Sequence, residues 1–163
     1  MRRAVSLAAT FIFLVLAPGI VAGYIPWRMS GWRFHPPFWG WTGFRYAGAA
    51  LIAAGLPVLL ESFVRFAWKG LGTPAPVMPT RHLVVSGLYR HVRNPMYVAV
   101  VAMIAGQALL FSQLNLLLYA AGFWIAAHLF VIFYEEPTLH HKYGAEYDAY
   151  REKVPGSGVI DGR

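Results

Sequence analysis

The longest uncharged stretch of the chain constrains its fold most strongly. From Asn94 to Tyr134 the chain contains no aspartate, glutamate, lysine or arginine. Written as one helix, this stretch would be about 60 Å long, roughly twice the thickness of the hydrocarbon layer of a bilayer. The polar sequence Ser112-Gln113-Leu114-Asn115 interrupts it near the middle. The pattern predicts a helical hairpin of two transmembrane spans, at residues 96–111 and 115–134, joined by a tight turn.

Two further apolar segments, residues 4–24 and 45–66, are long enough to cross a bilayer. The first follows two arginines and therefore also resembles a signal peptide, but its apolar run is long for one, so we expect a retained span. Hydrophobic residues make up 58% of the chain and charged residues 13%, against about 25% charged residues in a typical soluble domain. We expect an all-α, polytopic membrane protein in which residues 1–163 form a single membrane domain.

The distribution of basic residues predicts the orientation of these four spans. Most of the basic residues fall in the N-terminus, in the loop 67–95 and in the tail 135–163, whereas Arg28, Arg33 and Arg45 fall on the opposite side. Because short cytoplasmic segments are enriched in lysine and arginine, both termini are expected in the cytoplasm. This asymmetry explains the net charge of +7 without a nucleic-acid partner. The chain has no cysteine, so it has neither a disulfide framework nor a thiolate metal site, and we expect no metal.

A polar block precedes the hairpin, between residues 70 and 97. Gly87 can adopt a positive φ and lets a ligand approach the backbone. Pro95 suits the first turn of the third span, where its missing N–H costs nothing. The free amides of that turn can bind an anion, and Arg90 and Arg93 add positive charge. Arginines at this position could equally face lipid phosphates.

A second polar block follows the hairpin. Glu135 and Glu136 are adjacent carboxylates at a membrane boundary, where they repel each other and are costly to desolvate, so a cationic ligand or an arginine would stabilise both. Pro137 removes a helix hydrogen bond and is expected to kink the chain. His128 lies seven residues before Glu135 and shares its helix face, either as a functional group or as a helix–helix hydrogen-bond donor. Residues 139–152 are expected to form one amphipathic helix, whose tyrosines either pack against other residues or lie at the membrane interface.

Closing the hairpin would bring the two blocks together, and at both the sequence resembles a known family. The pattern G-x-Y-x-x-x-R-[HN]-P-x-Y is found from Gly87 to Tyr97, and E-E-x-x-L from Glu135 to Leu139. It is followed by [FY]-G-x-E-Y-x-x-Y-x-x-x-V-P, from Tyr143 to Pro155. These patterns resemble those of the isoprenylcysteine carboxyl methyltransferases and the related phospholipid N-methyltransferases. Asn94 stands where many members have histidine, so no histidine role is carried over to it.

The resemblance implies S-adenosyl-L-methionine as the methyl donor, bound over the cytoplasmic ends of the last two spans. Its binding residues are then expected in both blocks: Val85, Gly87, Leu88, Tyr89, His91, Arg93, Asn94, Pro95, Tyr97, Glu135 and Glu136. The carboxylates suit its ammonium or ribose hydroxyls, and Arg93 suits its carboxylate. Arg93, Glu136 and His128 are the candidates for catalysis.

The methyl acceptor is expected to be an amphiphilic lipid or a prenylated small molecule or peptide. A carboxylate acceptor needs no base, whereas an amine must lose a proton. Because the sequence shows no dedicated base, we place a carboxylate first, as in isoprenylcysteine carboxyl methylation. The alternatives are N-methylation of a phospholipid such as phosphatidylethanolamine, an NADPH-dependent membrane reductase of the sterol type, and a non-catalytic membrane scaffold.

Overall fold

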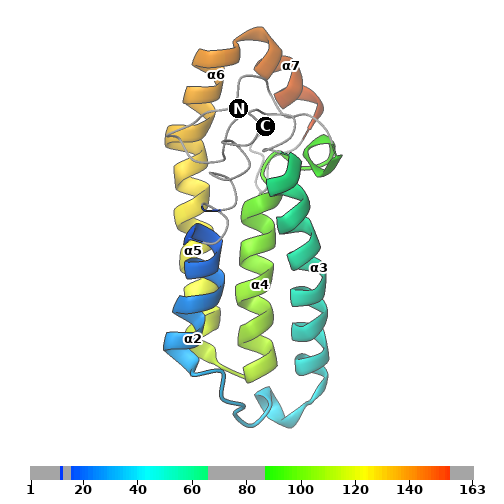
Figure 1. Ribbon diagram of the computed structural model, residues 1–163, viewed down its shortest axis with the longest axis vertical. Coiled ribbons are helices and arrows are strands. Elements are labelled where there is room, and N and C mark those ends of the chain that lie inside the picture. The colour runs from blue at the N-terminus through cyan, green and yellow to red at the C-terminus, as the bar shows by residue number, and fades with distance from the viewer. Residues whose placement is uncertain (1–11, 13–15, 66–86, 155–163) are drawn as a thin grey trace.

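The computed structural model describes residue 12, residues 16–65 and residues 87–154. All regular structure in these residues is helical, which confirms the all-α prediction. Three long helices, α3 (Gly43–Arg65), α4 (Pro95–Phe111) and α5 (Leu114–Phe130), lie side by side with α4 in the middle (Figure 1). The N-terminal part of the predicted span 4–24, most of the loop 67–95 and the end of the tail, residues 155–163, lie outside the described residues.

The predicted hairpin is present, and its turn falls at the polar interruption. Helix α4 ends at Phe111 and α5 begins at Leu114. Ser112 between them adopts a left-handed conformation with φ 57°, and the amide of Gln113 donates to the carbonyl of Ala108 over 2.9 Å. The same carbonyl also accepts from the amide of Ser112, so both residues of the turn are hydrogen-bonded to the end of α4.

Two helices of the described chain are long and apolar enough to cross a membrane. They are α3 and the continuous helix Leu114–Tyr143, and the shorter α4 is also apolar. Only 28% and 22% of the residues in their most apolar windows are buried, whereas the core helix of a soluble protein is mostly buried. Leucine, isoleucine and phenylalanine side chains on their outer faces are exposed, Phe133 by 77%. Exposed apolar surface of this extent fits lipid contact, although the four-span topology stays a prediction.

The segment before α3 remains helical six residues beyond residue 24, where the first span was expected to end. A π-helical turn, η1 (Ile20–Tyr24), continues directly into α2 (Ile25–Ser30), which ends at Gly31 with φ 58°. Pro26 lacks an N–H, so it can donate neither to the carbonyl of Ala22, four residues before it, nor to that of Val21, five residues before it.

Side chains from the hairpin satisfy both of these carbonyls. Gln107 of α4 donates to Ala22 over 2.6 Å, and the hydroxyl of Tyr119 in α5 donates to Val21 over 2.9 Å. The oxygen of Gln107 also accepts a 3.0 Å bond from the indole of Trp32. The first helix continues through a proline because its neighbours replace the missing bonds. A loop with the short 3₁₀ turn η2 (Phe38–Gly40) then leads into α3.

Glycines bring the backbones of α3 and α4 into contact. A Cβ atom added at Gly48 would lie 2.5 Å from the carbonyl oxygen of Gly106, and one added at Gly106 would lie 2.7 Å from that of Gly48. Here small residues serve close packing, as in membrane helix pairs. Further along the same helix pair, buried Leu59 and Phe63 of α3 and Ile104 of α4 belong to the apolar core.

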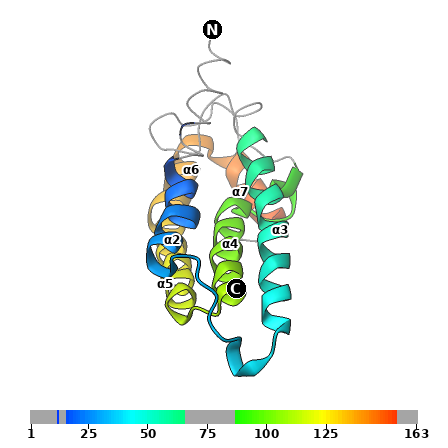
Figure 2. The same cartoon turned by 60° about the horizontal axis from the view of Figure 1, so that its bottom comes forward.

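The polar C-terminal segment differs from its prediction as a single helix. Helix α5 continues through a second π-helical turn, η5 (Val131–Glu135), directly into α6 (Glu136–Tyr143), and a separate helix α7 (Ala145–Lys153) follows. The break falls at Gly144, whose φ 51° and ψ −125° are readily adopted only by glycine. Pro137 stands in the first turn of α6, just after η5, so the disturbance expected at this proline takes the form of a π-turn. Figure 2 shows α6 and α7 across one end of the helices.

Candidate functional site

The two polar blocks meet at the end of the bundle where α3 and α5 finish and α4 begins, which we call the site end. The first block contributes η4 (Gly87–Arg90) and the start of α4, and the second contributes η5, α6 and α7 (Figure 1). The closed hairpin therefore juxtaposes segments that are about forty residues apart in sequence, as expected from its length.

An ion pair between Arg93 and Glu136 joins the two blocks directly. An Nη1 hydrogen of Arg93 is donated to Oε1 of Glu136 over 2.6 Å. The arginine side chain is 7% exposed and the glutamate side chain 20%. A second cation, Arg151 of α7, lies 3.8 Å from the other carboxylate oxygen. Buried charges are stable only when paired in this way, so the pair fixes the first block against α6.

Glu135 points to a different partner from its neighbour. Its Oε2 accepts a 3.3 Å hydrogen bond from the hydroxyl of Tyr97, one turn inside α4. Among the described residues the structure pairs Glu136 with arginines and Glu135 with a phenol. The adjacent carboxylates therefore differ in charge balance. Glu136 is paired with cations, whereas no arginine of the described chain neutralises Glu135, and burial raises the pKa of the Glu135 carboxyl to about 7.

Tyrosines connect η4 to α7. The hydroxyl of Tyr150 donates a 2.6 Å bond to the backbone carbonyl of Tyr89. Tyr89 is 5% exposed, and its phenol hydrogen-bonds to Ser62 of α3. Burial raises the pKa of the Tyr89 phenol well above its usual range, and the nearby Glu135 carboxylate raises it further. Burial also raises the pKa of Tyr147 and Tyr150, so all three phenols stay protonated.

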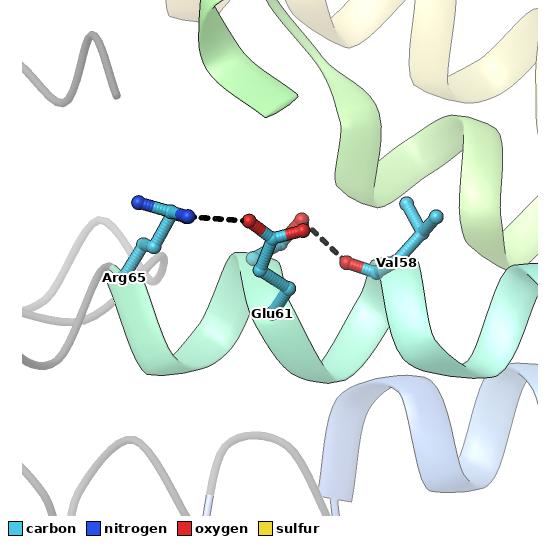
Figure 3. A network of polar contacts seen from close by, with 4 residues as sticks. Val58, Glu61 and Arg65 are labelled. Atoms are coloured by element: carbon cyan, nitrogen blue, oxygen red, sulfur yellow. Dashed lines mark hydrogen bonds and ion pairs between the residues drawn. The ribbon is translucent and has the colours of Figure 1, made fainter. Parts of the chain in front are cut away.

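Helix α3 reaches the first block through Arg65. Figure 3 shows Glu61 and Arg65 on consecutive turns near the end of α3, with the guanidinium against the carboxylate. Oε1 of Glu61 accepts from Nε over 2.7 Å and lies 2.6 Å from Nη2. The same guanidinium lies directly over Gly87, where an added Cβ atom would overlap it, and Gly87 has φ 66°. Gly87 is required here both by its backbone conformation and by this close approach.

The remaining predicted residues occupy varied positions. Pro95 is buried at the start of α4, and Asn94 caps that helix without a side-chain hydrogen bond. His91 is exposed. His128 stacks on Trp124 with ring centroids 6.5 Å apart and lies about 10 Å below Glu135 along the helix. Val85 and the side chain of Leu88 lie outside the described residues. The structure thus brings together Gly87, Tyr89, Arg93, Tyr97 and both glutamates, and it leaves His91 and His128 apart from them.

Several residues of the site were not predicted to belong to it. Tyr147 and Tyr150 carry part of the second family pattern, but their spacing alone indicated packing. Arg151 occupies a variable position of that pattern and is identified only by its distance to Glu136. Ser62 and Arg65 come from α3, and no local signal in the sequence connects them to the blocks after it.

The assembled groups suit a zwitterionic ligand better than a purely anionic or cationic one. Arg93 offers a guanidinium whose Nε is buried and has no hydrogen-bond partner in the described chain. Glu135 offers a carboxylate that is hydrogen-bonded by Tyr97 alone among these residues. One group of each sign at a boundary between apolar helices and polar segments can hold the ammonium and carboxylate of an amino-acid moiety.

Comparison with known proteins identifies the family of the chain. No curated protein and no solved structure gives a significant match to the chain. A family model described as phospholipid methyltransferase matches residues 44–146. The matched region begins at the start of α3, includes η4, the hairpin, both glutamates and α6, and ends at the second residue of α7. The chain is thus a membrane protein that belongs to the phospholipid methyltransferase family.

Proposed function

We propose that the site end binds S-adenosyl-L-methionine and transfers its methyl group to an amphiphilic acceptor in the membrane. The observation that supports this most directly is the 2.6 Å contact between Arg93 and Glu136, because it assembles the two sequence patterns into one site. Membership of a methyltransferase family supports the reaction class. When bound, the cofactor supplies an electrophilic methyl group on a sulfonium.

The described residues fit the amino-acid portion of this cofactor. The unpartnered Nε of Arg93 provides a donor for the carboxylate, and the carboxylates of Glu135 and Glu136 provide acceptors for the ammonium or the ribose hydroxyls. Without a ligand, Arg93 and Glu136 neutralise each other, so binding would replace one close ion pair by two.

For the acceptor we favour an amine of a membrane phospholipid over a carboxylate. The matched family is that of phospholipid methyltransferases. Burial raises the pKa of Glu135 to about 7, which suits exchange of a proton with an amine near neutral pH. An amine must lose its proton before its lone pair attacks, and a carboxylate such as Glu135 can accept that proton. His128 lies deeper along the helix and is a second candidate for this role. This choice reverses the earlier preference for a carboxylate acceptor, which depended on the lack of an evident base in the sequence.

A carboxylate acceptor, as in isoprenylcysteine methylation, remains the second candidate. The observation that favours it is the pair of arginines, Arg93 and Arg151, around Glu136. Either cation could orient a carboxylate without any proton transfer. In both cases the protein contributes positioning and exclusion of water, which the buried Tyr89 and Tyr147 at the junction support.

The test is transfer of a labelled methyl group to lipid. The purified protein in phospholipid nanodiscs is incubated with methyl-labelled S-adenosyl-L-methionine, and the extracted lipids are separated by class. We expect label in N-methylated phosphatidylethanolamine for wild type and for Arg28→Gln, an exposed arginine far from the site end, and none for Arg93→Gln. Label in a base-labile ester would favour the carboxylate acceptor, and binding of NADPH without methyl transfer would contradict the proposal.

A further inference from the structure

Arg65 has unused hydrogen-bonding capacity at the site end. A guanidinium carries five N–H donors in a planar fork. Glu61 occupies only the edge formed by Nε and one hydrogen of Nη2. The other edge, with Nη1, has no ion-pair partner within residues 16–65 and 87–154, and the side chain is 30% exposed. An arginine held by one carboxylate and open along its second edge is arranged to bind an oxyanion in a bidentate manner.

The direction of this side chain distinguishes it from an arginine that merely ends a membrane helix. Such an arginine normally extends away from the apolar helix toward water. Arg65 instead lies over Gly87, the first residue of the sequence pattern that forms η4. Arg90, the last residue of η4, is exposed and adds a second positive charge at the same turn. Ser62, one turn before Arg65, contacts Tyr89 of η4. This face of α3 therefore borders the candidate site.

The depth of Arg65 indicates the source of the anion. Helix α3 has 23 residues and is about 34 Å long, close to the thickness of the hydrocarbon layer. Its last residue then lies at the level of the lipid headgroups, where the phosphodiester is the abundant oxyanion. A free phosphate could satisfy the same donors, but it would not be held at this depth by acyl chains.

We propose that Arg65, held by Glu61 and assisted by Arg90, binds the phosphodiester of the phospholipid acceptor and thereby selects phospholipids over other membrane amines. This inference rests on the proposed function, since it assigns the acceptor side of the same site. Arg65 binds the headgroup phosphate, while the groups around Glu135 face the headgroup amine and the cofactor. Glu61 is a positioning residue that acts through Arg65.

The experiment compares two acceptors that differ in their phosphate. Nanodiscs of phosphatidylcholine are doped either with phosphatidylethanolamine or with a synthetic two-chain lipid that bears a primary amine and no phosphate. For Arg65→Gln we expect the KM for phosphatidylethanolamine to rise about tenfold, as for loss of a charge-assisted hydrogen bond. The kcat, the KM for the phosphate-free amine and the Kd for S-adenosylhomocysteine should stay within about twofold. The KM of Arg65→Lys for phosphatidylethanolamine should lie between those of wild type and Arg65→Gln, because lysine keeps a point charge.

The remaining outcomes overturn the inference in separable ways. An equal loss toward both lipids, or weaker binding of S-adenosylhomocysteine, would show that Arg65 only holds η4 or belongs to the cofactor site. Unchanged kinetics, or competition by millimolar inorganic phosphate equal to that by lipid, would also contradict a phospholipid site.

A readout independent of turnover separates failure of this inference from failure of the proposed function. Native mass spectrometry of the detergent-solubilised protein counts retained lipids. We expect wild type to retain phosphatidylethanolamine in preference to the phosphate-free amine, and Arg65→Gln to lose that preference while Arg28→Gln keeps it. If wild type methylates neither lipid but shows this preference, the proposed function fails and the phosphate site stands. If wild type methylates lipid but shows no preference, the phosphate site fails alone.

Discussion

Tyr150 donates a 2.6 Å hydrogen bond to the backbone carbonyl of Tyr89, 61 residues earlier in the chain. The bond fastens the last helix of the described chain onto η4, in which Gly87 and Tyr89 belong to the first sequence pattern. Because the pKa of Tyr150 is raised by burial, its hydroxyl remains a donor throughout the physiological pH range. The contact holds the two halves of the site together without contributing a charge.

Replacing Tyr150 by Phe should therefore weaken the contact between α7 and η4 without leaving a cavity. The ring stays, but the carbonyl of Tyr89 loses its partner, which costs about 1–3 kcal/mol when an acceptor is buried. We expect a lower melting temperature in detergent and weaker binding of S-adenosylhomocysteine. Tyr134→Phe, at a position that is 47% exposed, is the matched control and should leave both unchanged. Equal behaviour of the two variants would show that the Tyr150 bond is not formed.

Gln107 should be essential for holding the first helix against the hairpin. Leucine at this position would leave the carbonyl of Ala22 and the indole of Trp32 without their partners. Within an apolar bundle, we expect the free energy of unfolding to fall by about 1–3 kcal/mol. Gln113→Leu removes only exposed contacts at the turn and should lower the free energy of unfolding by less. Thermal unfolding of both variants measures the difference, and the reverse order would contradict the described packing.

Two glycines on neighbouring helices should respond oppositely to alanine. At Gly106 the added methyl would meet the backbone of Gly48 and the side chain of Ile52 at 2.7 and 2.8 Å, whereas at Gly122 nothing lies within 4 Å. We expect Gly106→Ala to destabilise the protein by about 1–3 kcal/mol and Gly122→Ala to stabilise it by about 0.5–1 kcal/mol. The melting temperatures of the two variants provide the test. A stable Gly106→Ala variant would mean that α3 and α4 do not touch here.

The predicted orientation in the membrane can be tested directly because the chain has no cysteine. Single cysteines at Arg33 and Glu152, both exposed, lie at opposite ends of the helices. In intact cells, a membrane-impermeant thiol reagent should label position 33 and not position 152. After cell lysis, the reagent should label position 152 as well. Labelling of both positions in intact cells would contradict cytoplasmic placement of the site end.

The hairpin and the meeting of the two blocks could be predicted because they depend on local signals. An uncharged stretch long enough for two crossings, a polar interruption and Pro95 at a helix start together specify α4, the turn and α5. Closing the hairpin then places Glu135 and Glu136 at the same end of the helices as Arg93. These features need no knowledge of contacts distant in sequence.

Other features depend on distant contacts and could not be predicted in this way. The helix through Pro26 survives because Gln107 and Tyr119 bind its free carbonyls. The division of the last helix at Gly144 depends on a backbone conformation that a helical pattern does not reveal. Arg65 joins the site only because α3 and η4 pack together, and its i, i+4 pair with Glu61 resembles an ordinary surface ion pair.

The central claim is that the two adjacent glutamates belong to a cofactor site. Its most direct test is calorimetric titration of S-adenosylhomocysteine into wild type, Glu135→Gln, Glu136→Gln and Glu152→Gln, the last an exposed control in α7. Each of the first two substitutions keeps size and removes charge, and should weaken binding by about 1.5–3 kcal/mol, or roughly 10- to 150-fold. Glu136→Gln should also lower thermal stability, because it leaves Arg93 buried without its counter-charge. Affinity equal to that of wild type in both Glu135→Gln and Glu136→Gln would contradict the account.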